Sequence, residues 1–316
     1  MAKKPRDAKN PDGADAPELM QAPASVAHES QENESQESRH SWCPDGPEID
    51  LASPHAAHLL DDMVPALAGK GQLRLVYQPK TDLSTSRCIG AEALLRWNHP
   101  TLGAVPPDEF VPLVEHTSLM NAMTDWAFAA ALPQVAVWRA EGFAPQISIN
   151  VSMRDLSDER FATRLAEMLE RHGVRPDWID IEVTESADMK DPACTKRQLD
   201  EIRRLGVAIE IDDYGTGHAG LSYLKLVPAS YLKIDQAFIS HLATDSTDQI
   251  IVRSTIDLAH KLGLKVVAEG IRDEAALGWL REHGCDIGQG NLLSPPLEAE
   301  DFERLLRAQQ QLVPIR

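Results

Sequence analysis

Two adjacent carboxylates are the most suggestive chemical feature of the sequence. Asp212 and Asp213 follow the apolar run Val207–Ile211, and Gly215 and Gly217 come directly after them. This order predicts a buried strand whose C-terminal tip carries two hard ligands and is followed by a tight loop. Because neighbouring carboxylates repel one another, a compact fold tolerates them best in water or beside a cation, so the pattern is compatible with a metal site. A solvated strand end before an ordinary glycine turn has the same sequence.

Polar residues also end the other apolar runs of the chain. In chain order the whole set is Glu92, Asn150, Glu182, Asp212, Asp213, Lys233, Asp235, Glu269 and Gln289. A charged side chain within an apolar run is costly unless it is paired or bound to a metal ion. Because the set consists mostly of oxygen donors and contains no His or Cys, it favours Mg²⁺ or Mn²⁺ over zinc or copper.

The adjacent carboxylates also indicate what such ions would do. Asp212 and Asp213 can bridge one ion and bind a second, and two ions about 3.5–4 Å apart activate a water and stabilise a leaving oxygen. Lys233 shares a strand face with Asp235 and can hold the attacking water. An ordinary ion pair with a carboxylate would explain the same lysine. Phosphodiester hydrolysis is the reaction that suits the whole set.

The elements that must position these residues alternate along the chain. The first two predicted strands, Leu73–Pro79 and Cys88–Leu95, are joined by a link too short for a crossover helix, so we expect them to pair antiparallel. Six more strands are predicted at Gln146–Val151, Ile179–Val183, Val207–Ile211, Tyr231–Ile234, Lys265–Ala268 and Cys285–Gly288. Helices are predicted at Leu119–Glu141, Glu159–His172, Ala193–Leu205, Ala219–Leu226, Gln249–Leu262, Glu274–His283 and Ala299–Gln311.

This alternation predicts an α/β fold, a (β/α)8 TIM-type barrel with an antiparallel first strand. A doubly wound open sheet is the alternative, but no G-x-G-x-x-G follows the first strand. In a barrel of this type the C-terminal ends of the strands open on one face. We therefore expect the polar set to converge there.

Composition limits the classes of function. The chain has 316 residues, of which 43% are hydrophobic and 25% charged, and a net charge of −18. A protein this acidic is not expected to bind a nucleic-acid polymer or an anionic membrane surface. Its four cysteines are scattered without a CxxC pair, which favours a reducing compartment, so we expect a cytoplasmic location. We expect no signal peptide and no membrane span, because no apolar stretch approaches the ~20 residues that cross a bilayer.

The distribution of apolar residues predicts three regions. Residues 1–50 are polar and acidic with few apolar anchors, so we expect a disordered tail, which can also recruit a protein partner. Residues 51–71 contain a predicted lead-in helix, Ser53–Ala68, with Ser53 as N-cap and Pro54 as the first helical residue. Residues 72–311 form the predicted barrel domain.

Several motifs together resemble one known family. Residues 92–97, Glu-Ala-Leu-Leu-Arg-Trp, look like the signature of the EAL-domain cyclic-di-GMP phosphodiesterases. The similarity runs from about Leu73 to Leu297. It includes Tyr77-Gln78-Pro79, Asn150-Val151-Ser152, Glu182-Val183-Thr184-Glu185-Ser186, Asp212-Asp213-Tyr214-Gly215-Thr216-Gly217, Leu232-Lys233-Ile234-Asp235, Ala268-Glu269-Gly270 and Gln289-Gly290.

The resemblance implies a reaction and a role for each matching residue. The implied reaction is in-line attack on one 3′–5′ phosphodiester of cyclic-di-GMP, which gives linear pGpG. The implied catalytic residues are Lys233, which orients the nucleophilic water, Glu92 and Glu269. The implied ligands of two Mg²⁺ or Mn²⁺ ions are Glu92, Asn150, Glu182 and Asp212 for the first, and Asp212, Asp213 and Glu269 for the second. The implied substrate-binding residues are Gln78, Arg96, Asp235 and Gln289. Glu185 is implied to steady the loop after Asp213, which in the family links dimer contacts to the metal site, so a homodimer is expected.

The chain departs from the family pattern at a few positions. Arg272 stands where the family usually has Glu, three residues after Glu269, and a cation there can weaken the second metal site. His218 and Asn291 replace common aromatic residues, and Tyr214 replaces a common Phe. No GGDEF signature precedes the barrel, so cyclase activity is not expected. The alternative to the enzyme is a receptor or scaffold that binds cyclic-di-GMP without cleaving it and acts through a protein partner.

Overall fold

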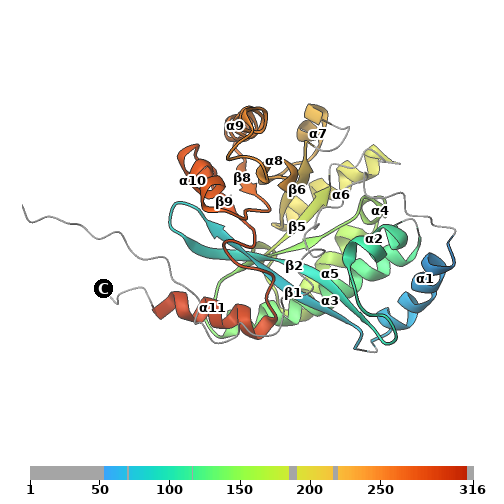
Figure 1. Cartoon of the computed structure of the whole chain (residues 1–316). Coiled ribbons are helices and arrows are strands. Elements are labelled where there is room, and N and C mark those ends of the chain that lie inside the picture. Colours follow the sequence, from blue (N-terminus) through green and yellow to red (C-terminus); the bar gives the residue numbers. More distant parts are fainter. Residues whose placement is uncertain (1–52, 70, 116, 185–190, 216–219, 312–316) are drawn as a thin grey trace, which may run out of the picture. The chain divides into compact units, whose positions relative to one another are not determined.

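The computed structural model describes residues 53–69, 71–115, 117–184, 191–215 and 220–311, so the tail expected at residues 1–50 lies outside it. The described strands form one sheet in the order β1-β9-β8-β7-β6-β5-β4-β2-β3. The sheet closes into a barrel because β1 also pairs with β2, while β3 extends β2 as a hairpin. Figure 1 shows the strands inside and the helices around them.

The bounds of the elements follow the predicted alternation closely. The strands are β1 (Leu73–Asp82), β2 (Arg87–His99), β3 (Gly103–Val105), β4 (Gln146–Asn150), β5 (Ile179–Thr184), β6 (Ala208–Tyr214), β7 (Tyr231–Ile234), β8 (Lys265–Ala268) and β9 (Ile287–Gly288). The helices are α1 (Pro54–Leu67), α2 (Pro107–Glu115), α3 (Leu119–Ala140), α4 (Met153–Leu156), α5 (Phe161–His172), α6 (Pro192–Leu205), α7 (Gly220–Leu226), α8 (Gln236–Ile239), α9 (Ser246–Lys261), α10 (Glu274–Glu282) and α11 (Ala299–Gln311), with a 3-10 turn at Pro176–Trp178.

One barrel strand runs against the others. β1 is antiparallel to both of its neighbours, β2 and β9. From β2 through β4 to β9 every neighbouring pair is parallel. The prediction of an α/β barrel with an antiparallel first strand is therefore confirmed.

The parallel strands have an apolar face toward the helices and a polar face toward the barrel interior. Ile147 of β4 and Ile209 of β6 are buried in one core cluster with Leu199 of α6. Alternate residues point the other way, and Ser148 donates to Glu210 across the interior over 3.1 Å. Because successive side chains of a strand point to opposite faces, one short run supplies both the core and the polar interior.

The lead-in helix packs beside the end of β2. The hydroxyl of Ser53 accepts a hydrogen bond from the Ala56 N–H over 3.1 Å, so the expected N-cap is present. Met63 of α1 packs in a second apolar cluster with Trp97 of β2 and Phe110 of α2.

Two elements near this cluster were not predicted. The helix α2 has Pro107 at its start and Pro112 inside it, and such residues are usually read as turn signals. The strand β3 is only three residues long. No helix in the described part of the chain has the length and the apolar character that crossing a membrane requires.

Candidate active site

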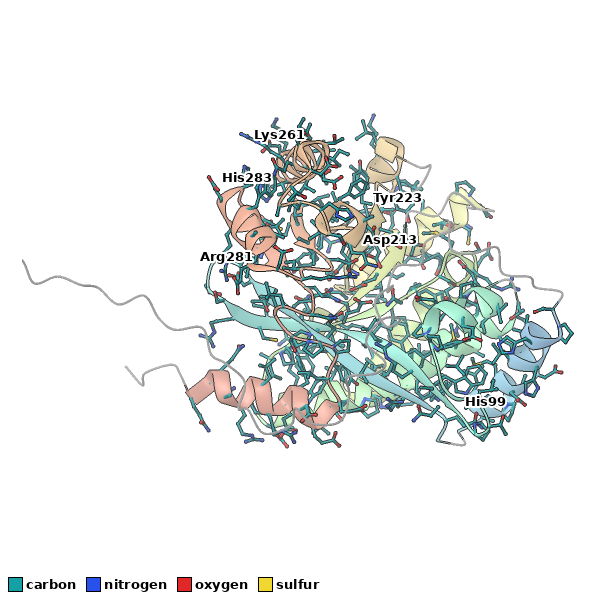
Figure 2. All side chains as sticks on the ribbon, in the orientation of Figure 1. His99, Asp213, Tyr223, Lys261, Arg281 and His283 are labelled. Carbon is teal, nitrogen blue, oxygen red and sulfur yellow. The ribbon has the colours of Figure 1, made fainter. Side chains whose placement is uncertain are left out.

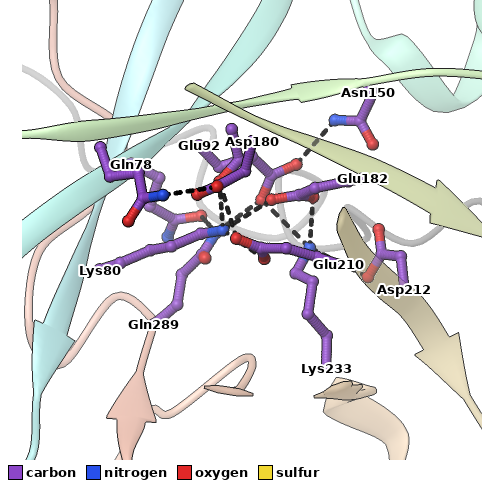
Figure 3. A network of polar contacts seen from close by, with 12 residues as sticks. Gln78, Lys80, Glu92, Asn150, Asp180, Glu182, Glu210, Asp212, Lys233 and Gln289 are labelled. Carbon is purple, nitrogen blue, oxygen red and sulfur yellow. Dashed lines mark hydrogen bonds and ion pairs between the residues drawn. The ribbon is translucent and has the colours of Figure 1, made fainter. Parts of the chain in front are cut away.

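A buried lysine lies at the centre of the polar interior. Lys233 of β7 is 1% exposed. Its Nζ lies 2.6 Å from Glu182 Oε2, 2.6 Å from Glu269 Oε1 and 2.9 Å from Asp212 Oδ1. Glu92 Oε2 is 3.6 Å away. These carboxylates belong to β2, β5, β6 and the residue after β8, so the barrel brings together groups that are far apart in the sequence. Figure 3 shows Lys233 with Glu92, Glu182 and Asp212.

Amide side chains surround Glu92. Asn150 donates from Nδ2 to Glu92 Oε1 over 2.9 Å, so its amide oxygen points away from Glu92 (Figure 3). Gln289 donates from Nε2 to Glu92 Oε2 over 2.8 Å and to Gln78 Oε1 over 3.0 Å. Gln289 Oε1 accepts no hydrogen bond from the residues that the structure describes. The structure therefore gathers four predicted residues at one place and leaves amide oxygens for further ligands.

A bulge at the end of β6 brings its two adjacent carboxylates to one place. In a regular strand Asp212 and Asp213 would point to opposite faces. The pairing of β6 with β7 shifts between Ile211 and Tyr214, and Asp213 has φ 53. A left-handed backbone costs a residue other than glycine about 1–2 kcal/mol. As a result, ligand oxygens of Asp212, Asp213 and Glu269 all lie within 4.8 Å of one another.

Burial and crowding change the pKa values of this cluster. Burial raises the pKa of Asp212 to about 7, and the charges of Glu182 and Glu92 add to the rise while Lys233 opposes it. Burial and the charge of Asp212 raise the pKa of Asp213 to about 9. Burial lowers the pKa of Lys233, but the surrounding carboxylates outweigh it and hold that pKa well above its usual value. The raised pKa values of Asp212 and Asp213 reflect carboxylates that are buried close together around one lysine.

The donor set fits hard divalent cations. Burial raises the pKa of Glu269 well above its usual range, and the charges of Asp212 and Glu92 raise it further. A cation relieves such repulsion between buried carboxylates. Carboxylate and amide oxygens are also the donors that Mg²⁺ and Mn²⁺ prefer.

A second polar layer lies deeper in the barrel, and the sequence analysis missed it. Lys80 Nζ of β1 lies 2.6 Å from Ser148 Oγ, 2.7 Å from Glu182 Oε1 and 2.7 Å from Glu210 Oε2. Burial and the charge of Glu210 raise the pKa of Asp180, in the same layer, well above its usual range. A sequence signal did exist, because each of these residues lies two positions from a predicted site residue and shares its strand face. The pairs are Lys80 with Gln78, Ser148 with Asn150, Asp180 with Glu182, and Glu210 with Asp212.

A pocket adjoins the site between β2, α2 and α3. It contains about 790 Å³ of empty space, including the part that opens to solvent. Its lining includes Glu92 and Asn150 of the site, together with Arg96, Asp108 and Met120. Arg96, which was predicted to bind substrate, is therefore at the edge of a space that adjoins the carboxylate cluster.

The other residues singled out in the sequence lie near α8 or outside the described part of the chain. Asp235 is buried, and its carboxylate caps α8 by accepting from the Ala237 N–H over 2.8 Å. Arg272 donates to Gln236 Oε1 over 3.1 Å, also on α8. Glu185 and His218 lie outside the described residues. The charge of Asp235 also raises the pKa of Asp213, so Asp235 lies close to the carboxylate cluster. A substrate contact for Asp235 stays a prediction.

Another group of ligand-type side chains, His58, Asp62 and His99, does not suit a metal ion. Figure 2 shows His99 far from Asp213. His99 Nδ1 faces two backbone N–H groups at 3.2 and 3.3 Å, one of them from Thr101, so Nδ1 is an acceptor. Its Nε2 therefore has the proton and donates to Asp62 Oδ2 over 2.8 Å. Because a metal would need the lone pair of Nε2, this group is better explained as a link between α1 and β2.

Comparison with known proteins identifies the family. The model of the EAL domain matches residues 61–296, and the chain therefore belongs to the EAL domain family. It is 39% identical over 266 residues to the cyclic di-GMP phosphodiesterase PA2567 of Pseudomonas aeruginosa, which covers 84% of this chain and 45% of that protein. It is 38% identical over 293 residues to the bifunctional diguanylate cyclase/cyclic di-GMP phosphodiesterase MucR of the same organism, covering 92% of this chain and 42% of that one. The chain thus spans less than half the length of these two relatives.

Solved structures agree with this assignment. The PaMucR phosphodiesterase in complex with c-di-GMP aligns with a TM-score of 0.73 and 41% identity, covering 78% of this chain and 99% of that one. The EAL enzyme Bd1971, in a form with cAMP and cyclic-di-GMP bound, aligns with a TM-score of 0.75 and 33% identity, covering 81% and 70%. These alignments agree with the EAL domain family and with the barrel fold.

Proposed function

We propose that this protein is a metal-dependent phosphodiesterase that hydrolyses cyclic-di-GMP to linear 5′-pGpG with two divalent ions, Mg²⁺ or Mn²⁺. The observation that supports this most strongly is the convergence of Glu92, Glu182, Asp212 and Glu269 on one buried ammonium. Relatives named as cyclic di-GMP phosphodiesterases support the same substrate.

The residues that would hold the ions are those of the carboxylate cluster. They are Glu92, Asn150, Glu182 and Asp212 for the first ion, and Asp212, Asp213 and Glu269 for the second. When bound, the two ions supply an activated water and stabilise the leaving oxygen of the phosphodiester. The amide of Asn150 favours this assignment because its nitrogen donates to Glu92 and its oxygen points elsewhere.

Lys233 is proposed to orient the nucleophilic water. An ammonium has three protons and no lone pair, so it acts as a donor and fixes the direction of the water's lone pairs. Without ions its three protons are directed at Glu182, Asp212 and Glu269. A proton of Lys233 would become available to the water where one of these carboxylates serves as an ion ligand instead. Fixing the water in this way reduces the entropy that must be lost on the way to the transition state.

The adjoining pocket is proposed to hold one end of the dinucleotide. A guanidinium can bind a phosphate through two parallel hydrogen bonds, which suits Arg96 at the pocket wall. The apolar side chain of Met120 fits a flat base, and the carboxylate of Asp108 can accept from the N–H groups of a guanine. Gln78 and Gln289 are proposed to bind the substrate on the other side of Glu92.

Nucleotide analysis tests the proposal. Purified protein is treated with EDTA, supplied with Mg²⁺ or Mn²⁺, and incubated with cyclic-di-GMP before the nucleotides are separated. We expect pGpG with either ion added back, and none in EDTA or with the variant Glu182→Gln. Protein that is folded by circular dichroism and forms no pGpG with either ion would refute the enzymatic proposal.

A cyclic-di-GMP receptor is the second candidate, because of Arg272. This guanidinium donates to Gln236, and an added Cβ on Gly270, next to Glu269, would lie 2.3 Å from the Cβ of the same Gln236. The positive charge of Arg272 therefore acts, through Gln236, on the segment that contains Glu269, a proposed ligand of the second ion. Tight binding of cyclic-di-GMP without hydrolysis at saturating Mn²⁺ would favour the receptor, and rapid turnover would exclude it as the main role.

The oligomeric state of the protein, its protein partner and its location in the cell are also proposed. The family resemblance favours a homodimer, and residues 1–50 are proposed to bind a protein partner. The scattered cysteines favour the cytoplasm. Sedimentation equilibrium with and without cyclic-di-GMP measures the mass of the assembly and tests the homodimer. Deletion of residues 1–50 is expected to abolish binding of the protein partner.

A further inference from the structure

We propose that Lys80 is a positioning residue for the first metal ion: it anchors one carboxylate oxygen of Glu182 so that the other oxygen faces the ion. The inference rests on the proposed function and deepens it, because it assigns a role to a side chain outside the ligand set. Lys80 touches neither the substrate nor the ions in this scheme and acts through Glu182.

The contacts of Lys80 use the whole capacity of its ammonium. The residue is 4% exposed, and its Nζ has partners at 2.6 Å on Ser148 and at 2.7 Å on both Glu182 and Glu210. A lysine ammonium has three protons to donate, so no donor is left over. Three acceptors from three neighbouring strands therefore fix where this nitrogen lies.

Glu182 lies between two lysines. Its Oε1 is 2.7 Å from Lys80 Nζ, and its Oε2 is 2.6 Å from Lys233 Nζ (Figure 3). The two oxygens thus have separate tasks: one is tied to the deeper layer, and the other points into the carboxylate cluster. A carboxylate with one oxygen anchored cannot turn about its last bond without losing a buried, charge-assisted hydrogen bond. Such outer contacts orient metal ligands generally.

The antiparallel direction of β1 explains why this lysine reaches the deeper layer. Gln78 and Lys80 share one face of β1, and Gln78 lies opposite Glu92 in the register with β2. β1 runs toward the N-terminal ends of the other strands. Lys80, two residues after Gln78, therefore lies on the N-terminal side of the predicted ligands. It therefore reaches the level of Ser148 and Glu210, which on their parallel strands come two residues before a predicted ligand.

The competing explanation is that Lys80 only balances buried charge. Both Glu182 and Glu210 have an oxygen 2.7 Å from its ammonium, so either carboxylate would be left without that cation in a Lys80 variant. The two explanations differ in what restores function. Neutralising Glu210 restores the balance of charge but gives Glu182 no anchor.

The test compares three variants by calorimetric titration with Mn²⁺ and by steady-state kinetics. We expect Lys80→Met to weaken Mn²⁺ affinity and to lower kcat by about 10–100-fold, the usual effect of losing an outer contact to a metal ligand, with little change in KM for cyclic-di-GMP. The matched control Glu210→Gln keeps the Lys80–Glu182 contact and is expected to bind Mn²⁺ like the wild type. The double variant Lys80→Met/Glu210→Gln is expected to fold, because its buried charge is balanced, and to stay defective in Mn²⁺ binding.

The outcomes separate this inference from the proposed function. Wild-type or tighter Mn²⁺ affinity in Lys80→Met, or recovery in the double variant, would overturn the positioning role and leave the phosphodiesterase proposal standing. If Lys80→Met does not fold, the double variant decides by the same titration. Failure of the wild-type protein to bind Mn²⁺ would refute the proposed function and this inference with it.

Discussion

Removing the central ammonium should separate metal binding from turnover. In Lys233→Met the side chain keeps most of its volume but loses its charge, and three carboxylates lose a partner within 2.9 Å. Removing one member of a buried ion pair costs about 3–5 kcal/mol because it leaves uncompensated charge. We therefore expect the free energy of unfolding of the metal-free variant to fall by about that amount.

Metal affinity is expected to change in the opposite direction. The carboxylates in the variant have no ammonium to compete with an added cation, so part of the lost stability returns when Mn²⁺ binds. A return of about 1.4 kcal/mol corresponds to tenfold tighter binding. Turnover is expected to fall by about 10²–10⁴-fold, because the variant lacks the donor that is proposed to orient the nucleophilic water.

The assays are urea unfolding with and without Mn²⁺, calorimetric titration with Mn²⁺, and pGpG formation. Lys261→Met is the matched control, since Lys261 is exposed on α9 and far from Asp213 (Figure 2). We expect that control to leave all three measurements unchanged. Weaker Mn²⁺ binding in Lys233→Met, or wild-type turnover, would refute the reasoning.

Three further substitutions test the surroundings of the cluster. Asp213→Asn is expected to stabilise the metal-free protein in urea unfolding by about 1 kcal/mol, the usual scale of one substitution, because it removes one of three buried carboxylates with ligand oxygens within 4.8 Å. Gly270→Ala is expected to cost about 1–3 kcal/mol in thermal unfolding and to lower kcat, because Gly270 has φ +63 and an added Cβ would lie 2.3 Å from the Gln236 Cβ. Arg272→Glu is expected to tighten Mn²⁺ binding in calorimetry and to raise turnover at limiting Mn²⁺, because it restores the carboxylate usual in the family.

Each of these predictions has a result that contradicts it. A lower free energy of unfolding for metal-free Asp213→Asn than for the metal-free wild type would contradict the first prediction. For Gly270, the matched control is Gly278→Ala in α10, where an added Cβ meets nothing within 4 Å and is expected to stabilise the helix by up to about 1 kcal/mol. Equal effects at Gly270 and Gly278 would remove the steric argument. Unchanged Mn²⁺ affinity in Arg272→Glu would mean that the guanidinium does not act on the proposed second metal site.

Much of the fold was predictable because the apolar runs have a simple period. Strands such as Tyr231–Ile234 and Lys265–Ala268 were predicted with their actual bounds, since a short apolar run between helices has few other interpretations. The antiparallel pairing of β1 with β2 followed from the short link between them. By contrast, α2 was not predicted, because Pro107 and Pro112 are residues that usually indicate a turn.

The order of residues along the chain is enough to show which polar side chains end the strands, and hence that oxygen donors gather at one end of a barrel. The directions of these side chains depend on the fold. A shift in the pairing of β6 with β7 and the left-handed backbone of Asp213 let two neighbours in the chain reach one place, which strand periodicity alone forbids. Closure of the barrel put Lys80 against Glu182, 102 residues away, because β1 runs opposite to its neighbours. Both depend on pairing between distant strands, and a single strand's sequence does not contain that information.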